Sequence, residues 1–437
     1  MTLNEYLTSI ADAIRAKNKS TDKIKAEGFA GEILSLKTGS SGSVMKKDVN
    51  FYDYEGTLLH SYTLAEAQML TALPELPERN GLTAQEWNYT LEEIKSYDRP
   101  VDVGAIYTTD DGASRFYVTI DAEYRKNVNF GFQISVANGA TMDWGDGSAP
   151  ETISTASWAW YPHTYENFGS YVIKITPIDG CTLKFGEGSA TSFQIIGSSL
   201  KKAEFGNGVT HINFDSCLSL KEVVIPNSVT TVSTNCFKSC KQLQTVVLPK
   251  NVKFDNGSCY FDGSAVNKVI LPHTFTGTLE SAFQNCKALC DIVLPNNGNI
   301  SSASLAFSAC ENLDNVVLPS NMTKIYYRMF YGNAGLINLN IPNNIESIDS
   351  EAFADCIRLQ KITLPNSLIS IASSAFNNAS RLKEVDCAAL DHVPSISSSS
   401  FAGCSNNELK FYVPSALYDE WIAASNWSSL ASKIVAV

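Results

Sequence analysis

A repeat of 23 or 24 residues organises the C-terminal half of this chain of 437 residues. An aliphatic residue followed by proline recurs in phase with a phenylalanine column. The aliphatic residues are Ile225, Leu248, Leu271, Leu294, Leu318, Ile341 and Leu364, and the phenylalanines are Phe237, Phe261, Phe283, Phe307, Phe330, Phe353, Phe376 and Phe401. A unit this short cannot bury its own apolar face, so the period predicts a solenoid whose turns share one core.

Each unit indicates a short strand, a turn and a second short element. The positions up to the proline alternate between buried and outward residues, which is typical of a strand that buries one face. Proline has no N–H for the ladder and ends that strand. Neighbouring strands lie about 4.8 Å apart, so we expect each phenylalanine to stack on its counterpart in the next turn.

Six of the eleven cysteines share one column of the repeat. They are Cys217, Cys240, Cys286, Cys310, Cys356 and Cys404. The total is odd and no Cys-x-x-Cys pair occurs, so we predict packing thiols and neither ligands nor disulfides.

The repeat resembles the BspA-type leucine-rich repeats of bacterial surface proteins and phage structural proteins. The resemblance covers roughly residues 190–437, and we place the solenoid at 186–437. Residues 411–437, with Trp421 and Trp427, resemble the terminal cap of that family. A cap is physically required, because the last turn would otherwise expose its core.

Two segments precede the solenoid and resemble parts of tail-associated proteins of phages and prophages. Residues 1–44 combine helical apolar spacing with a Gly/Ser linker, which predicts a tethered helical hairpin for docking. Residues 45–121 predict a small α+β module, with hairpin signals at Glu55-Gly56 and at 110–112 and a capping box at Thr63. The resemblance implies docking on other tail or baseplate proteins.

Residues 122–185 resemble PKD-like domains, which are immunoglobulin-type β-sandwiches used as spacers. We expect Trp144 to anchor a core and Gly145-Asp146-Gly147 to form a turn that needs positive φ. Asp143 and Asp146 could ligate calcium or cap the turn, and two carboxylates alone do not decide this. The expected fold class is therefore a multidomain α+β protein that ends in the solenoid.

Composition, charge and motifs limit the classes of function that the chain could have. The charge is 33 − 45 = −12, which disfavours a nucleic-acid partner. No segment reaches the ~18 apolar residues of a membrane helix, and the first residues lack the features of a signal peptide. We therefore expect cytosolic synthesis and a place in a virion tail, with the cell surface as the alternative. No metal-ligand or catalytic motif occurs, so we expect no catalytic residue, metal or cofactor.

Candidate binding residues form the outward column of the predicted strands, on what we expect to be a concave face. They are Val224, Val247, Ile270, Val293, Val317, Asn340, Thr363 and Asp386. The first five are aliphatic, which fits either plain strand propensity or an interface for another chain, and both interpretations stay open.

Aromatic side chains supply further candidates. Trp158 and Trp160 share one strand face, which fits sugar stacking or packing. Tyr326, Tyr327 and Tyr331 form a second cluster at the expected solenoid surface.

The predicted function is that of a non-enzymatic phage or prophage tail protein. It would dock by its N-terminal region and present the solenoid to a host-surface protein or glycan, with a homo-oligomer possible. A bacterial cell-surface adhesin is the alternative, and a glycan-processing enzyme is the third interpretation, since paired carboxylates need no motif.

Overall fold

The computed structural model describes residues 46–437 except 187–196, 255–257, 297–299 and 405–407. The chain divides into two compact units, and the fold below is that of the second, Lys47–Val437. The helical hairpin predicted for residues 1–44 lies outside the described residues. The described part is mostly β, and its three α-helices have five or six residues each, which corrects the expected α+β class.

A four-stranded sheet with two short helices forms what we call the N-terminal module, Lys47–Thr109. Its strands β1 (Val49–Tyr52), β2 (Leu58–Tyr62), β3 (Leu82–Trp87) and β4 (Val101–Thr109) follow the order β2-β1-β4-β3. The hairpin of β1 and β2 is confirmed, as is the capping box of Thr63 that opens α3 (Leu64–Gln68). A second capping box at Thr90 opens α4 (Leu91–Lys95).

The second predicted hairpin, around residues 110–112, is wrong. β4 pairs with β1 through Val101–Gly104 and with β3 through Ala105–Thr109, and the Thr109 N–H donates to the Phe205 carbonyl and not to β5 (Ser114–Ile120). β5 pairs instead with β10 (Gly169–Pro177) and β12 (Leu200–Glu204). The turn therefore carries the chain from one sheet into another.

Strands β5 to β11 form two facing sheets. One holds β5, β10, β7 (Ala140–Asp143) and β8 (Glu151–Thr152), and the other holds β9 (Ala159–Thr164), β6 (Asn127–Ile134) and β11 (Leu183–Lys184). Trp144 is buried between them, and Gly145 and Gly147 have φ of 75° and 90°, as predicted. Each sheet runs on into a row of solenoid strands, and the core is continuous, so the sandwich shields the first turn from water.

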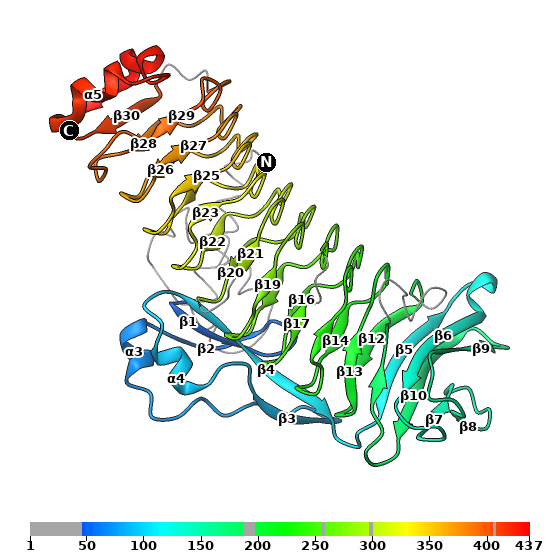
Figure 1. The fold of residues 1–437 in the computed structure, drawn as a ribbon. Coiled ribbons are helices and arrows are strands. Elements are labelled where there is room, and N and C mark those ends of the chain that lie inside the picture. The colour runs from blue at the N-terminus through cyan, green and yellow to red at the C-terminus, as the bar shows by residue number, and fades with distance from the viewer. Residues whose placement is uncertain (1–45, 187–196, 255–257, 297–299, 405–407) are drawn as a thin grey trace, which may run out of the picture. The chain divides into compact units, whose positions relative to one another are not determined.

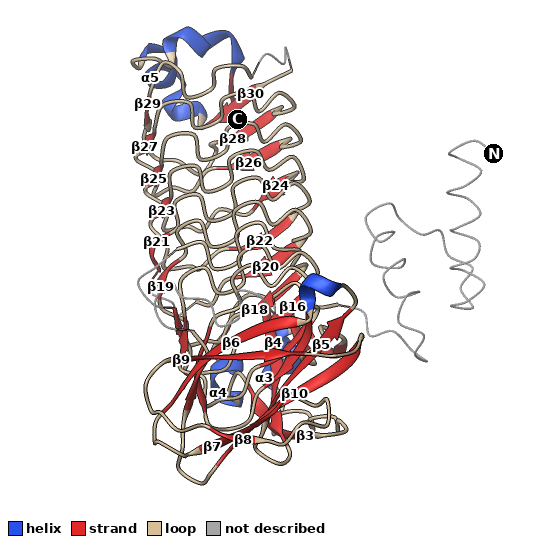
Figure 2. Ribbon diagram, turned by 90° about the vertical axis from the view of Figure 1, so that its right-hand side faces the viewer, coloured by secondary structure: helices blue, strands red, loops and turns tan. Residues whose placement is uncertain are grey.

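The solenoid consists of two rows of short parallel strands, one along each side of the coil (Figures 1 and 2). The front row comprises β14 (Glu222–Val224), β16 (Thr245–Val247), β18 (Lys268–Ile270), β20 (Asp291–Val293), β22 (Asn315–Val317), β24 (Asn338–Leu339), β26 (Lys361–Thr363), β28 (Glu384–Asp386) and β30 (Lys410–Val413). The back row comprises β13 (Val209–Ile212), β15 (Thr231–Val232), β17 (Lys253–Phe254), β19 (Gly277–Thr278), β21 (Ile300–Ser302), β23 (Lys324–Ile325), β25 (Ser347–Ile348), β27 (Ser370–Ile371) and β29 (Ser395–Ile396).

The predicted columns fill the core between the rows. Consecutive phenylalanine rings from Phe214 to Phe401 lie 5.0–5.7 Å apart and within 18° of parallel. All six cysteines of the column are buried and free, and the Cys286 thiol donates to the Phe261 carbonyl of the preceding turn at 3.0 Å. The packing role is therefore confirmed.

The C-terminal cap closes the last turn. β31 (Ile434–Ala436) extends the front row beside β30, and α5 (Tyr418–Ala423) brings Trp421 into the core. Trp427 is also fully buried, and its indole N–H donates to the Pro394 carbonyl at 2.7 Å.

Candidate binding surface

The outward aliphatic residues of the first front-row turns are buried. Val224, Val247, Ile270 and Val293 are at most 8% exposed, although the sequence predicted that they face solvent. The N-terminal module packs against the first three. Val224 joins the core of the module, and Val247 and Ile270 pack with Tyr52 and Ile106 from β1 and β4.

Strand β4 fits between the helices and the solenoid because its side chains alternate. Val101, Val103, Ala105 and Tyr107 belong to the core that includes α3 and α4. The intervening residues Asp102, Gly104 and Ile106 meet the front row. Because a Cβ at Gly104 would lie 2.2 Å from Cγ1 of Val247, this close approach requires glycine.

The proline column creates a row of backbone acceptors along the front row. In a parallel ladder, the N–H of Leu248 reaches the carbonyl of Ile270, and the carbonyl of Leu248 would accept from residue 272. That residue is Pro272, which has no N–H. Each aliphatic residue before a proline is therefore left with a carbonyl that the next turn cannot satisfy, wherever that turn also has proline.

The module supplies donors to four successive carbonyls of this row. Asn88 Nδ2 donates to Leu248 at 3.1 Å, and the Tyr89 hydroxyl donates to Leu271 at 3.2 Å. The guanidinium of Arg99 spans the next two turns and donates to Leu294 and to Leu318, each at 2.5 Å. Such groups are costly to bury unpaired, so these bonds fix the register of the module on the solenoid.

Aromatic contacts and a histidine complete this internal interface. The Tyr97 hydroxyl lies 2.9 Å from Nδ1 of His273, and the rings of Tyr89 and Tyr97 meet the His273 ring edge-on. Burial lowers the pKa of His273, because charging the ring here would cost solvation energy.

A buried ion cluster joins β4 to the front row. Lys268 Nζ lies 2.5 Å from Oδ2 of Asp102 and 2.9 Å from Oδ1 of Asp291, and it sits 4.6 Å from the ring centre of Tyr52. Burial by itself lowers the pKa of Lys268, but the two carboxylates outweigh it and raise the pKa.

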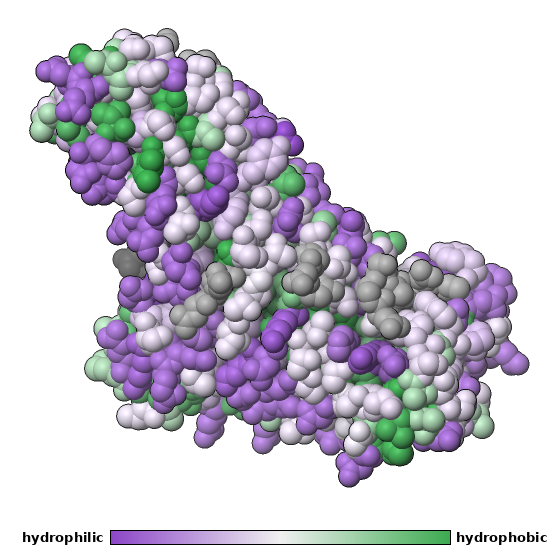
Figure 3. Space-filling model, viewed as in Figure 1, coloured by the Kyte–Doolittle hydropathy of each residue, from purple (hydrophilic) through white to green (hydrophobic). Residues whose placement is uncertain are grey.

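The later front-row turns are less covered. Val317 is half-buried, Asn340 and Thr363 are exposed, and Asp386 is half-buried. The carbonyls of Ile341 and Leu364 continue the row of acceptors and have no hydrogen-bonding partner among the described residues. In Figure 3, hydrophilic and hydrophobic residues are interspersed over the visible face of these turns.

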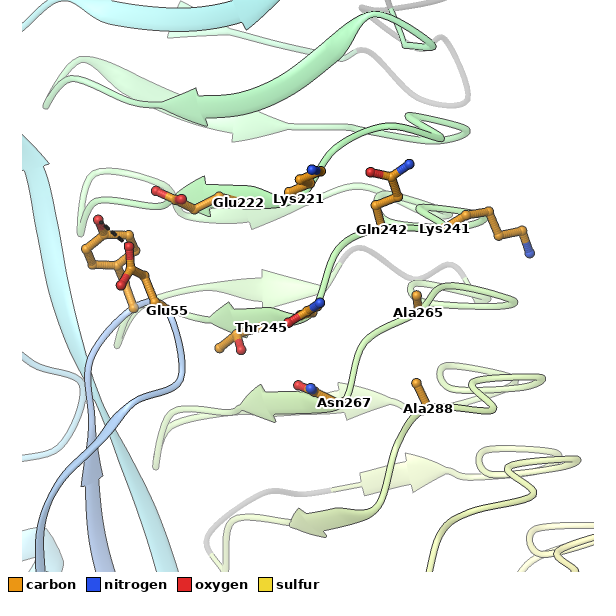
Figure 4. Close-up of a pocket in the computed structure, with 11 residues that line it drawn as sticks. Glu55, Lys221, Glu222, Lys241, Gln242, Thr245, Ala265, Asn267 and Ala288 are labelled. Carbon is orange, nitrogen blue, oxygen red and sulfur yellow. Dashed lines mark hydrogen bonds between the residues drawn. The ribbon is translucent and has the colours of Figure 1, made fainter. Parts of the chain in front are cut away.

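A hollow of about 710 Å³ lies where the β1–β2 turn approaches the solenoid (Figure 4). Tyr54 and Glu55 line one side, and the polar residues Lys221, Gln242 and Asn267 line the other. Local sequence patterns could not predict this hollow, because its two walls are more than 150 residues apart along the chain.

The aromatic candidates form two separate groups. The rings of Trp158 and Trp160 are half-buried and perpendicular, and both pack over Gly131, which has no side chain of its own. Tyr327 and Tyr331 flank the guanidinium of Arg328, each with its ring centre 5.1 Å away.

Tyr326 points elsewhere and donates to the Ile300 carbonyl. The structure thus brings Tyr327 and Tyr331 together without Tyr326.

The carboxylates at the Gly145 turn are occupied by turn and side-chain hydrogen bonds. Asp143 accepts from the Gly145 N–H at 2.8 Å. Asp146 accepts from Ser148 and lies 2.7 Å from Nε2 of His163. Burial tends to raise the pKa of Asp146, but these hydrogen bonds hold it at about 2.

The described residues contain no cluster of three His, Cys, Asp or Glu side chains arranged to hold a metal ion. None of their helices has the length and apolar character needed to cross a bilayer.

Comparison with known families decides the nature of the repeat. Residues 207–336 and 280–408 match the BspA type leucine-rich repeat region, in six copies. Residues 207–408 of the solenoid thus match a BspA-type leucine-rich repeat region. The parallel rows and the stacked phenylalanines described above are the physical form of this repeat.

Solved leucine-rich repeat structures show distant likeness. They include a protein from Bacteroides ovatus ATCC 8483 (18% identity, covering 53% of this chain and 76% of that chain, TM-score 0.25) and a cell surface protein from Faecalibacterium prausnitzii A2-165 (20%, 50% and 84%, 0.26). The pneumococcal vaccine antigen PcpA is a third (19%, 53% and 64%, 0.35). No curated protein matches the chain. These values are too low to transfer a ligand to this chain.

Proposed function

We propose that this protein is a non-enzymatic binding protein of a bacterial surface that recognises a host protein or glycan through the later front-row turns. One observation supports this proposal. The chain covers the apolar outward residues of β14, β16 and β18 with its own module, and it leaves polar side chains such as Asn340 and Thr363 exposed farther along the same row.

The geometry suits recognition without chemistry. Each turn of a solenoid is held by its neighbours, so its outward residues are fixed before a partner arrives and little ordering entropy is lost on binding. The internal interface is an example of how such a face can be bound. Apolar side chains make contact in its middle, and side-chain donors bind the row of carbonyls at its edge. Ile341 and Leu364 extend this edge into the uncovered turns.

A phage or prophage tail is the second candidate location for the same binding role. The resemblance of residues 1–121 to tail-associated proteins favours it. Docking of the N-terminal region on tail or baseplate proteins, homo-oligomer formation and the PKD-like identity of residues 122–185 stay predictions. A glycan-processing enzyme has no supporting observation among the described residues.

The test compares two double variants of the full chain. N340R/T363R places bulky charges on the front row, and S347R/S370R places the same charges on the back-row strands β25 and β27 of the same region. The probes are immobilised mammalian matrix proteins and isolated Gram-positive cell walls. We expect the first variant to lose binding at least about tenfold and the second to bind like the wild type.

The two probes separate the candidate locations. Binding to matrix proteins supports the adhesin, and binding to cell walls supports the tail protein. If N340R/T363R binds as tightly as the wild type, or if the wild type binds neither probe, the proposed role of the front row is rejected.

A further inference from the structure

Lys268 has two carboxylate neighbours and is almost fully buried. Its side chain is 10% exposed, and that of Asp102 is 5% exposed. Tyr52 covers the amine from the module side, with its ring centre 4.6 Å from Nζ. Lys268 and Asp291 belong to the solenoid and Asp102 to the module, so the cluster bridges two parts that are 166 residues apart in sequence.

A second lysine of the chain provides an internal comparison. Lys202 also contacts two carboxylates, those of Glu204 and Glu222, but its side chain is 26% exposed. Water therefore reaches Lys202 more readily than Lys268. The two clusters have the same kinds of charged groups and differ in burial.

Each carboxylate around Lys268 has a distinct environment. Oδ2 of Asp102 contacts the amine, whereas Oδ1 of Asp102 accepts a hydrogen bond from Asn50 Nδ2 at 3.1 Å. Asp291 contacts the same amine through its Oδ1 at 2.9 Å. One carboxyl group is thus held beside the Lys268 ammonium, which becomes a nucleophile once it gives up a proton, and its far oxygen accepts from Asn50. A second carboxylate, that of Asp291, is within reach of the protons that would move.

We propose that Lys268 and Asp102 condense to an amide bond that covalently joins the N-terminal module to the solenoid. The two carboxylates raise the pKa of Lys268, so its resting form is the ammonium, and the reaction starts only when a proton passes from this group to Asp102 to give a neutral amine beside a neutral acid. Nζ then attacks Cγ of Asp102, and the charge that develops on Oδ1 is stabilised by the Asn50 amide.

Asp291 completes the proton transfers. It takes a proton from the attacking nitrogen and passes it to the Oδ2 hydroxyl, which leaves as water while the carbonyl forms again at Oδ1. One C–N bond forms and one C–O bond breaks. No oxidant, reductant or external group is consumed, and Asp291 returns to its starting state.

Burial and fixed geometry favour this condensation. Holding amine and acid in contact replaces a bimolecular encounter, and effective molarities of oriented groups reach about 10⁵–10⁸ M. The reaction also removes two buried charges, whose desolvation is costly even when they are paired. The product amide keeps a carbonyl oxygen at Oδ1, where Asn50 already donates.

The inference is independent of what the solenoid binds. Its first test is the intact mass of the folded full chain, measured after denaturation. We expect the wild type to be lighter than its sequence by one water molecule and to yield a tryptic peptide pair linked through Lys268 and Asp102. A wild-type mass equal to that of the sequence, after prolonged incubation of the folded protein, overturns the proposal.

Variants separate the roles of the three residues. K268R and D102A should show the full sequence mass, because each lacks one reacting group. D291N keeps both reacting groups and should condense at least about 100-fold more slowly, as the loss of a general base predicts. If D291N condenses as fast as the wild type, the role assigned to Asp291 is wrong.

Folding of each variant is checked by circular dichroism, so that a loss of the link is not confused with unfolding. Lys202 serves as the control within the same molecule, and no peptide linked to Glu204 or Glu222 is expected. A link at Lys202 of equal yield would refute the importance of burial.

Discussion

Asn333 stands in the cysteine column of the repeat, three residues after Phe330. Its side chain is fully buried, yet neither its amide nitrogen nor its amide oxygen has a hydrogen-bonding partner among the described residues. In the flanking turns the column holds Cys310 and Cys356, whose thiols donate to phenylalanine carbonyls at 3.0 and 3.1 Å. We therefore predict that N333C stabilises the solenoid.

The magnitude follows from the unpaired amide. A buried polar group without a partner costs about 1–3 kcal/mol, and cysteine removes this cost while keeping most of the volume. By analogy with the column, the new thiol would donate to the Phe307 carbonyl of the preceding turn. We expect N333C to raise the free energy of unfolding by about 1–3 kcal/mol.

Equilibrium unfolding in urea, followed by far-UV circular dichroism, measures the effect. Because repeat arrays can unfold in stages, hydrogen exchange of the amides near residue 333 reports the local change separately. The reciprocal variant A379N is the matched control, since Ala379 is a fully buried member of the same column. A379N should lower the free energy of unfolding by a similar amount. If N333C is no more stable than the wild type while A379N is destabilised, Asn333 has a stabilising partner and the reasoning fails.

Three further predictions concern the internal interface. G104A should lower the free energy of unfolding by about 1–3 kcal/mol, because its Cβ would collide with Val247, and urea titration measures the loss. R99A should lower the free energy of unfolding by about 2 kcal/mol or more, because it removes two hydrogen bonds to carbonyls. R99K should restore only part of this stability, and thermal unfolding measures both variants. Burial lowers the pKa of His273, so as the pH falls the unfolded chain protonates this ring before the folded chain does. The free energy of unfolding should therefore fall as the pH drops below about 6.5. H273Q should reduce this dependence on pH in urea titrations between pH 5 and 7.5. An unchanged slope in H273Q would contradict the last of these.

The solenoid could be predicted from the sequence because its signal is periodic and local. The strand, the proline stop and the inward phenylalanine recur within every unit, so each copy confirms the next. The capping box at Thr63 and the hairpin at Glu55-Gly56 were predicted from local signals, since their partners lie a few residues apart. The prediction of a hairpin around residues 110–112 was wrong because local turn chemistry does not reveal that β5 pairs with the distant strands β10 and β12.

The cover over the apolar turns could not be predicted from local patterns. The contacts that carry it join residues such as Asn88 to Leu248 and Arg99 to Leu318, which are 160 and 219 residues apart. Even so, one signal was present. The outward column is aliphatic from Val224 to Val317 and polar afterwards. Such a change along an otherwise regular repeat indicates which turns are covered by another part of a protein.

The proline column connects the repeat to the place where the module binds. Proline ends each strand, and it also lacks the N–H that would donate to the carbonyl of the preceding turn. A repeat with proline at each strand end therefore also has a row of carbonyl acceptors at a fixed spacing. The module uses four of these acceptors with side-chain donors, which no strand ladder could provide at prolines. At Leu364 the next turn has Ala388, but its N–H donates to Asp386 Oδ1 instead, so the carbonyl line continues where the proline pattern stops. A partner of the later turns would therefore meet the same kind of edge that the module meets on the earlier ones.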